Sequence, residues 1–433
     1  MSGRPNIVLV VMDDLGYGDL SCMGNTILNT PRIDSIAAGG ITLRHMYAAS
    51  AVCTPSRAAL LTGRYPQRVG LPKVLNPRDG TGLSEWEHTL PELLRDAGYR
   101  TAMFGKWHLG CRPEHYPTRH GFDEYAGLLY SNDMHPVELF EGEHISTADV
   151  DQATLTRAYT DHAIDFMERH SNEEAGRPFF VYLAHTMPHI PLHVEAEFRG
   201  RSAGGRYGDV VESLDHHVGR LLDALDDLGL ADDTLVMVTS DNGPWFEGST
   251  GGLRGTKLHT YEGGIRVPFV ARWPGRIPAG AVSDQPACLF DLLPTLAGLA
   301  GGSVPQDRPI DGVDVSALLA GGSVPEPRPL FFFHWWTLNA VRSGRWKLHL
   351  DRFPRDPNRA QDRELPQLFD LELDPAETYD LKDRHPDVLE HLTDLARRFE
   401  DEIAGQREAA EARAAGRATA GHPADGGRPL SSR

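Results

Sequence analysis

The amino-acid sequence predicts an α/β protein with a mainly parallel central sheet flanked by helices, followed by a smaller α+β domain with a short antiparallel sheet. Up to about residue 330, short β-rich apolar runs alternate with longer helical patterns, which is typical of a parallel sheet. The pattern then changes to closely spaced strands and one helix. We therefore expect a large domain over residues 1–330, a small domain over residues 331–404, and a disordered tail over residues 405–433.

Within the large domain, periodicity and turn residues mark the individual elements. Strands are expected where apolar, β-branched runs are bounded by polar residues, at 6–12, 100–104, 179–183 and 234–239. Helices are expected where apolar residues recur at helical spacing, at 91–97, 159–170 and 207–228. The stretch 301–329 is rich in Gly and Pro and is predicted to be a connecting loop.

The small domain has its own signals. Residues 338–350 are predicted to form a hairpin that turns at Ser343 and Gly344, and residues 368–373 another strand. Residues 387–403 carry apolar side chains at helical spacing. From residue 405 onward the chain is rich in Ala, Gly, Arg and Pro, which predicts a fraying helix and then the disordered tail.

Composition excludes several classes of protein. The formal net charge of −18 argues against a nucleic-acid partner, because phosphate binding needs a surplus of Lys and Arg. No apolar run is long enough to span a membrane, and the first apolar run is too short for a signal peptide, so we expect a cytoplasmic protein. The cysteines lack any CxxC pair and do not suggest a disulfide framework; they are Cys22, Cys53, Cys111 and Cys288.

Polar side chains follow four of the predicted strands, at the point where each strand ends. Ligands bind at the carboxyl ends of the strands in an open parallel sheet, so these side chains are expected to meet at one edge. An Asp after a strand is, taken alone, more often a helix cap or a turn residue, and a lone His is more often a structural group. The four groups together are hard to explain as caps; they are Asp13 and Asp14, Lys106 and His108, His185 and His189, and Asp241 and Asn242.

Four of these residues form a candidate metal site. Asp13, Asp14, Asp241 and Asn242 offer only hard oxygen donors, which suit Ca²⁺ or Mg²⁺. Converging carboxylates would repel one another without a cation. We expect Ca²⁺ before Mg²⁺, because its loose coordination tolerates an amide and a substrate oxygen.

The most specific segment is residues 53–63, Cys-Thr-Pro-Ser-Arg-Ala-Ala-Leu-Leu-Thr-Gly. Pro55 suits the first turn of a helix and Gly63 its C-terminal end, so Cys53 is expected at a helix N-terminus with Arg57 one turn further on. That environment favours anions. It therefore predicts a reactive Cys53 thiol with a depressed pKa.

This segment resembles the signature of the type I sulfatases, a family of the alkaline phosphatase superfamily with the alkaline phosphatase-like α/β fold. Cys53, Pro55 and Arg57 match the core Cys-x-Pro-x-Arg pattern. The resemblance continues over most of the chain and is nearest to the arylsulfatase A-like subgroup. Its further motifs are Asp13-Asp14, residues 105–110, Tyr130 to Asp133, Asp241-Asn242-Gly243, residues 252–257, residues 261–264, and residues 368–371 with Asp374, Pro375 and Glu377.

The resemblance implies how such a site would work. A separate formylglycine-generating enzyme would oxidise Cys53 to Cα-formylglycine, which, once hydrated, would attack the sulfur of a sulfate monoester and later release inorganic sulfate. The modified Cys53 would join Asp13, Asp14, Asp241 and Asn242 as a metal ligand. Asp241, beside the metal, is the best candidate for the base that activates the nucleophile.

The remaining candidate residues would act on the sulfate and the leaving group. Arg57 and Lys106 would hold the sulfate oxygens, with Ser131 as a weaker candidate. His189 and Lys257 would assist the departing alkoxide, and His108 would take a proton when the intermediate collapses. We assign the first role to His189 rather than His185 because His189 precedes an x-Pro pair, as in the family.

Two other functions are compatible with part of this pattern. The first is a phosphomonoester or phosphonate hydrolase of the same superfamily, but its two-metal members need extra ligands where this chain has Lys106 and Lys257. The second is an anion-binding protein in which Cys53 is never oxidised. The expected substrate is a small-molecule sulfate ester, either an aryl sulfate or a sulfated carbohydrate, and the sequence leaves that choice and the oligomeric state open.

Overall fold

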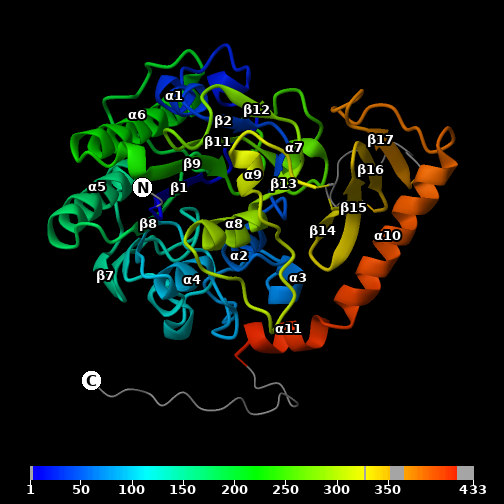
Figure 1. Cartoon of the computed structure of the whole chain (residues 1–433), viewed down its shortest axis with the longest axis horizontal. Coiled ribbons are helices and arrows are strands. Elements are labelled where there is room, and N and C mark those ends of the chain that lie inside the picture. The colour runs from blue at the N-terminus through cyan, green and yellow to red at the C-terminus, as the bar shows by residue number, and fades with distance from the viewer. Residues whose placement is uncertain (1–2, 326–327, 352–364, 417–433) are drawn as a thin grey trace.

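The computed structural model describes residues 3–325, 328–351 and 365–416 (Figure 1). A ten-stranded sheet forms its centre, in the order β12-β2-β11-β9-β1-β8-β4-β5-β6-β7. The strands are β1 Asn6–Met12, β2 Ile41–Leu43, β4 Arg100–Gly105, β5 Glu124–Gly127, β6 Leu139–Glu141, β7 His144–Thr147, β8 Phe179–His185, β9 Thr234–Ser240, β11 Phe269–Arg272 and β12 Ala281–Ser283.

The four strands predicted from the sequence are the parallel centre of this sheet. β9, β1, β8 and β4 are neighbours, and their register places Met12 opposite both His185 and Ser240. Their apolar runs are continuous because both faces of a parallel sheet are covered. The short strands that join antiparallel toward the edges, such as β11 and β6, carried no clear signal in the sequence.

Helices cover both faces of the sheet (Figure 1). One layer contains α1 Pro31–Ala38, α5 Leu155–Glu173 and α6 Gly205–Asp227, and the other contains α2 Cys53–Thr62, α4 Leu90–Asp96 and α8 Leu292–Leu299. The predicted helices at 91–97, 159–170 and 207–228 are confirmed as α4, part of α5, and α6. None of the described helices is both long and apolar enough to cross a bilayer.

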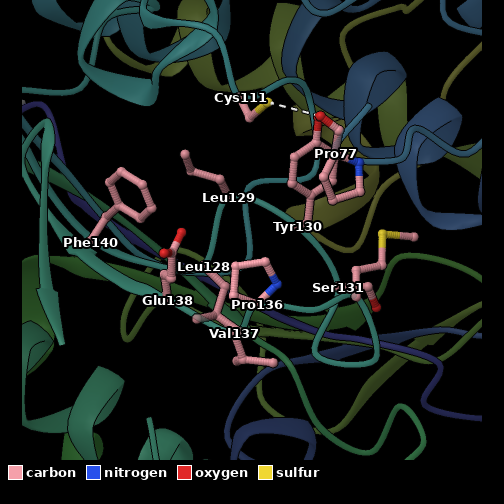
Figure 2. A pocket seen from close by; sticks show the side chains of 11 residues that line it. Pro77, Cys111, Leu128, Leu129, Tyr130, Ser131, Pro136, Val137, Glu138 and Phe140 are labelled. Atoms are coloured by element: carbon pink, nitrogen blue, oxygen red, sulfur yellow. Dashed lines mark hydrogen bonds between the residues drawn. The ribbon is translucent and has the colours of Figure 1, made fainter. Parts of the chain in front are cut away.

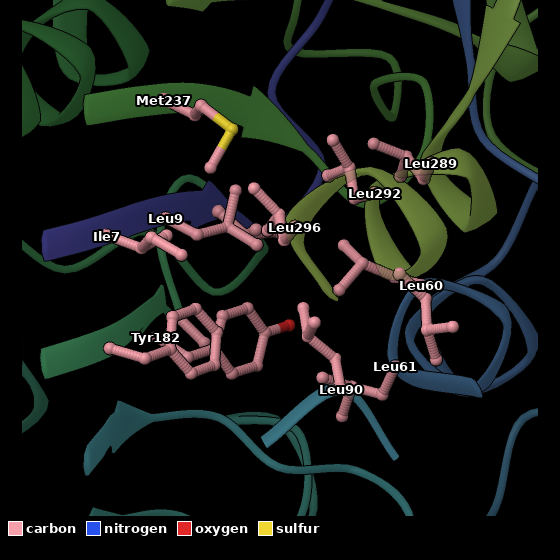
Figure 3. Close-up of a cluster of buried hydrophobic side chains, with 14 of the residues drawn as sticks. Ile7, Leu9, Leu60, Leu61, Leu90, Tyr182, Met237, Leu289, Leu292 and Leu296 are labelled. Carbon is pink, nitrogen blue, oxygen red and sulfur yellow. The ribbon is translucent and has the colours of Figure 1, made fainter. Parts of the chain in front are cut away.

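The alternation of side chains along β1 decides which residues reach the α2 layer. Ile7, Leu9 and Val11 belong to the core cluster that contains Leu60 of α2, and Figure 3 shows Ile7, Leu9 and Leu60 within it. Val8, Val10 and Met12 belong instead to the cluster formed with α5 and α6. Successive side chains of a strand point to opposite faces. The first residue after β1, Asp13, is therefore directed toward the face on which α2 and Cys53 lie.

The C-terminal part forms a four-stranded antiparallel sheet in the order β14-β15-β16-β17. Its elements are β14 Leu330–His334, β15 Thr337–Ser343, β16 Trp346–His349, β17 Gln367–Asp370 and the long helix α10 Pro386–Ala404. The predicted hairpin is confirmed as β15 and β16, and the predicted helix at 387–403 as α10. β14 was not predicted, although it pairs with β15.

The prediction of fraying from residue 405 is wrong for residues 407–414. Helix α11 Arg407–Ala414 packs against α3 Pro66–Val69 of the large domain, with Ala410 and Ala414 buried (Figure 1). The Ala410 carbonyl would lie only 2.2 Å from a Cβ at Gly70, so the two backbones touch where the sequence has glycine. The predicted disordered tail at 417–433 lies outside the described residues.

Smaller elements complete the fold. A three-stranded sheet contains β3 Met46–Tyr47, β10 Arg266–Val267 and β13 Ala287–Cys288, and short helices are α7 Glu262–Ile265 and α9 Ser316–Leu319. α9 interrupts the stretch 301–329 that was predicted to be loop. Single 3-10 turns lie at Ser21–Met23, Pro113–His115, Pro117–Arg119, Gln152–Thr154, Ala231–Asp233 and Leu289–Asp291.

Candidate active site

Cys53 is the first residue of α2, as the sequence predicted. Val52 before it is extended, and the helix ends at Gly63, whose φ of 68° is the left-handed conformation that glycine adopts readily. The prediction of a depressed thiol pKa is wrong, however. Burial is the largest effect and raises the pKa of Cys53, although Lys106 and Lys257 lower it in part. The unmodified thiol is therefore held in its neutral form.

The polar groups that follow the central strands converge on Cys53. Ligand atoms of Asp13, Cys53 and Asp241 all lie within 4.8 Å of one another. Asp14 is tied to the same cluster, because its backbone N–H donates to Asp241 Oδ1 at 3.2 Å and its Oδ1 accepts from Asn242 Nδ2 at 2.7 Å. Asp14 has a φ of 64°, a conformation that is uncommon outside glycine and that turns its side chain into the site.

Three cationic side chains neutralise the three carboxylates. Lys106 pairs with Asp13 and also donates to Ser131 Oγ at 3.0 Å, and Lys257 Nζ lies 2.8 Å from Asp14. Arg57 pairs with Asp241 at 2.8 Å and lies 3.6 Å from Asp13. All six side chains are buried.

The cations act unequally on the two carboxylates next to Cys53. Burial opposes the ionised form of Asp13, but Lys106 and its other cationic neighbours outweigh burial and hold its pKa well below the usual value. Burial dominates at Asp241 and raises its pKa to about 7, in spite of Arg57. A divalent cation would add further stabilisation to the ionised form of both groups.

The oxygens that remain free fit a hard cation. Asp13 Oδ1 and Asn242 Oδ1 are buried and have no hydrogen-bond partner within the described residues. Buried polar atoms without a partner are rare, and here both are oxygen donors of the kind that Ca²⁺ or Mg²⁺ binds. The residues predicted to hold a metal, Asp13, Asp14, Asp241 and Asn242, are thus brought together with two unused acceptors.

The structure separates the two candidate histidines after β8. His189 lines the cavity above Cys53, and its Nε2 lies 3.7 Å from Asp14 Oδ2. His185 is fully buried and packs against the Tyr159 ring, away from that cavity. His189 Nδ1 donates to Asn132 Oδ1 at 3.1 Å and to the Ile190 carbonyl at 2.6 Å, which leaves Nε2 to face the site.

His108 is fixed by the loop that follows α3. Its Nε2 donates to the Leu75 carbonyl at 3.0 Å, so Nδ1 of the neutral ring is an unprotonated acceptor. Thr54, next to Cys53, ties the same parts together: it donates to the His108 carbonyl at 2.9 Å and accepts from Leu75 N at 3.1 Å. Burial and the nearby Lys106 lower the pKa of His108 well below its usual value.

Above Cys53 lies a cavity of about 260 Å³. The predicted site residues that line it are Asp14, Cys53, His108, Ser131, His189 and Lys257. Its other walls are mostly apolar, with one further carboxylate: Val52, Val74, Asp133, Met134, Ile190, Trp245 and Leu258. No role in the site was predicted for these residues, because the loops that carry them meet only in the folded protein.

A second cavity of about 220 Å³ adjoins the first through Ser131 and Met134 (Figure 2). Its lining is largely apolar and includes Pro77, Leu129 and Phe140. Arg57 and Lys106 do not line either cavity; they lie beneath the first one, paired with carboxylates. Their expected contact with sulfate oxygens remains a prediction.

Comparison with known proteins places this fold and site in a family. The Sulfatase family model matches residues 5–303, and the model for the C-terminal region of N-sulphoglucosamine sulphohydrolase matches residues 256–405. The chain is 37% identical to N-acetylgalactosamine-6-sulfatase of Canis lupus familiaris, over 92% of this chain and 86% of that protein. It is 39% identical to arylsulfatase A of Bos taurus, over 92% and 87% respectively.

A solved structure agrees with this assignment. The crystal structure of Ps i-CgsB in complex with k-i-k-neocarrahexaose superposes with a TM-score of 0.83 at 29% identity, covering 95% of this chain and 98% of the other. The chain belongs to the sulfatase family, as a type I sulfatase of the alkaline phosphatase superfamily. It is a sulfuric ester hydrolase, which confirms the fold class and the enzyme class expected from the sequence.

Proposed function

We propose that this protein hydrolyses small sulfate monoesters through Cα-formylglycine made from Cys53, with one Ca²⁺ held by Asp13, Asp14, Asp241 and Asn242. The observation that carries the proposal is the position of Cys53 at the floor of the cavity, with ligand atoms of Asp13 and Asp241 within 4.8 Å. The cation and the hydrated aldehyde, when present, supply an activated oxygen nucleophile for the sulfur atom. Maturation then requires a formylglycine-generating enzyme as a partner.

The side chains around the cavity are suited to the two proton transfers that the reaction needs. Lys257 is buried and paired with Asp14, and although burial opposes its charge, Asp14 outweighs burial and raises its pKa. It therefore remains an ammonium group that can stabilise the departing alkoxide, together with His189. His108 presents an unprotonated Nδ1, which can accept a proton when sulfate is released.

Below the cavity, Arg57 and Lys106 supply fixed positive charge. Arg57 holds Asp241, and Lys106 bridges Asp13 and Ser131, so that Asp241 and Ser131 keep their orientation. Such preorganised charge is usually the largest catalytic contribution. The two-metal phosphohydrolases of the superfamily need a second set of metal ligands. This chain instead has the buried ion pairs of Lys106 with Asp13 and of Lys257 with Asp14, which disfavours the phosphohydrolase alternative.

The apolar upper walls are where the alcohol part of the ester would lie. Trp245 lines the cavity, and the ring of Phe246, which is 73% exposed, packs edge-on against it with the two ring centroids 4.9 Å apart. An aromatic wall of this kind accepts the flat face of an aryl group or of a sugar ring. Both the aryl sulfate and the sulfated carbohydrate are therefore retained as substrate classes.

The proposal is tested with protein produced together with a formylglycine-generating enzyme. We expect hydrolysis of 4-nitrophenyl sulfate, little hydrolysis of 4-nitrophenyl phosphate, and loss of more than about three orders of magnitude in kcat for Cys53→Ala. Mass spectrometry of the peptide with Cys53 measures the conversion of the thiol to the aldehyde. Activity that is indifferent to Cys53, or turnover of the phosphate alone, would overturn the proposal.

A further inference from the structure

A turn of the C-terminal domain delivers a buried carboxylate, that of Glu377, to the large domain. Glu377 N donates to the Asp374 carbonyl at 3.1 Å, which closes a turn with Pro375 at its second position. Asp374 Oδ2 accepts from the next two backbone N–H groups at 2.7 and 2.8 Å, which fixes the chain after the turn. Glu377 itself has a φ of 53° and is fully buried. The turn therefore explains the Asp-Pro-x-Glu motif as a device that presents one carboxylate inward.

Glu377 contacts the segment that carries Lys257, residues 252–264. Its Oε2 accepts from the backbone N of Glu262 at 2.6 Å, and its carbonyl accepts from Arg254 Nη1 at 2.9 Å. One residue of the C-terminal domain thus holds the segment on both sides of Lys257. The remaining oxygen, Oε1, accepts from His349 Nε2 at 2.7 Å and lies 3.0 Å from Lys347 Nζ.

Backbone hydrogen bonds connect the points held by Glu377 with Lys257 and fix the segment on the large domain. Gly263 N donates to the Arg254 carbonyl at 2.7 Å, which closes the segment into a loop. Lys257 N donates to the Pro244 carbonyl at 2.7 Å, and Leu258 N to the Ala51 carbonyl at 2.9 Å. The loop is tight, because a Cβ at Gly263 would lie 2.3 Å from the Gly255 carbonyl oxygen. A shift at Arg254 or Glu262 is therefore passed through this loop to the backbone that carries Lys257.

The buried charges of Glu377, Lys347 and Glu262 cost free energy to remove from water, so holding the two domains together does not by itself explain them. Lys347 lies between Glu377 at 3.0 Å and Glu262 at 2.9 Å, and all three side chains are fully buried. Apolar residues of similar size would join two domains at least as well as a buried ion pair. What apolar residues cannot do is accept the backbone N–H of Glu262 and fix its position.

We propose that Glu377 is a positioning residue, which holds the 252–264 segment so that the Lys257 ammonium stays at the oxygen of the leaving group. This inference rests on the role proposed above for Lys257. It assigns a function to the C-terminal domain that goes beyond covering the large domain. The domain supplies the carboxylate of Glu377, and it also supplies Lys347 and His349, the buried side chains that pair with that carboxylate.

The dependence of rate on the leaving group tests the proposal, because a purely structural role would not change it. We compare Glu377→Gln with the unsubstituted, fully matured enzyme on phenyl sulfate and 4-nitrophenyl sulfate. Phenolate is the poorer leaving group and depends more on a nearby ammonium. Glu377→Gln should lower kcat/KM for phenyl sulfate by about ten-fold more than for 4-nitrophenyl sulfate. Lys257→Ala should show the same preference, and the double variant should add little to Lys257→Ala alone.

The controls separate this inference from the proposed function. Glu372 lies in the same loop between β17 and α10, and its side chain is 62% exposed. Glu372→Gln should therefore leave kcat/KM unchanged on phenyl sulfate and on 4-nitrophenyl sulfate. Arg254→Met removes the hydrogen bond to the Glu377 carbonyl and leaves the Glu377 carboxylate in place. It should also lower the rate on phenyl sulfate more than on 4-nitrophenyl sulfate, which keeps the test valid where Glu377→Gln folds poorly. The positioning role alone would be overturned if Glu377→Gln and Arg254→Met lowered kcat/KM equally on both substrates while Lys257→Ala still lowered it more on phenyl sulfate. If Lys257→Ala lowered kcat/KM equally on both substrates, the role of Lys257 and this inference would be overturned together.

Discussion

Arg57 Nε and Nη2 both lie 2.8 Å from one oxygen of Asp241, and both side chains are fully buried beneath the cavity. Arg57 Nη1 also donates to the Lys106 carbonyl at 2.8 Å, which fixes the guanidinium at the end of β4. Asp241 Oδ1 is left to accept from Asp14 N, so a single arginine sets the orientation of the carboxylate beside Cys53. The pair joins α2, which carries Cys53, to the end of β9.

This pairing predicts that Arg57→Ala lowers the stability of the fold as well as the activity. The substitution leaves Asp241 buried without its cation, which typically costs about 3–5 kcal/mol. Chemical unfolding by urea at neutral pH measures the loss. Arg112→Ala, at a half-exposed arginine with a 4.0 Å contact to Glu114, is the matched control and should stay within about 0.5 kcal/mol of the unsubstituted protein. Equal stability of the two variants would contradict the prediction.

Removal of the metal should abolish hydrolysis and lower stability. A chelator should stop turnover of 4-nitrophenyl sulfate, and added Ca²⁺ should restore it better than Mg²⁺ does. Calcium at about 100 times its Kd should raise the free energy of unfolding by about 2.7 kcal/mol. Asn242→Ala should weaken Ca²⁺ binding in calorimetry, because its free Oδ1 is lost, while the exposed Asp232→Asn should not. Full activity in chelator would rule out the metal.

Trp245 should contribute to substrate binding more than to the chemical step. Its indole ring lines the cavity and offers the substrate an apolar surface, so Trp245→Ala should raise KM for 4-nitrophenyl sulfate by about ten-fold and change kcat little. Phe246→Ala, at the exposed neighbour of Trp245, should have a smaller effect on KM. Steady-state kinetics of both variants decide the matter, and a large fall in kcat with constant KM would place Trp245 elsewhere in the mechanism.

Glu262 should make stability depend on pH in the acid range. Burial opposes its charge, but Lys347, Arg342 and Arg266 outweigh burial and lower its pKa to about 2, from 4.5 in the unfolded chain. Its stabilisation, at most about 3 kcal/mol, is therefore complete above pH 4.5 and is lost as the pH falls toward 2. Urea unfolding should show Glu262→Gln less stable at pH 7, with a smaller difference at pH 3. A difference that is constant with pH would refute this assignment.

The sequence by itself determined the centre of the fold and the chemical groups of the site. Four apolar runs became adjacent parallel strands, and the polar residues after them met at one edge, because strand periodicity and the carboxyl-end rule are properties of short segments. Residues 53–63 likewise formed the predicted helix, since Pro55 and Gly63 act on the local backbone.

Only the tertiary structure decided which partner each group meets and how far it is buried. Burial reversed the predicted effect on the Cys53 thiol, paired Arg57 with Asp241, oriented His189 through Asn132, and packed α11 onto α3. The walls of the cavity and the contact of Glu377 with the 252–264 segment join residues far apart in the chain. Desolvation and pairing depend on every neighbour in space, and no local pattern of residues encodes those neighbours.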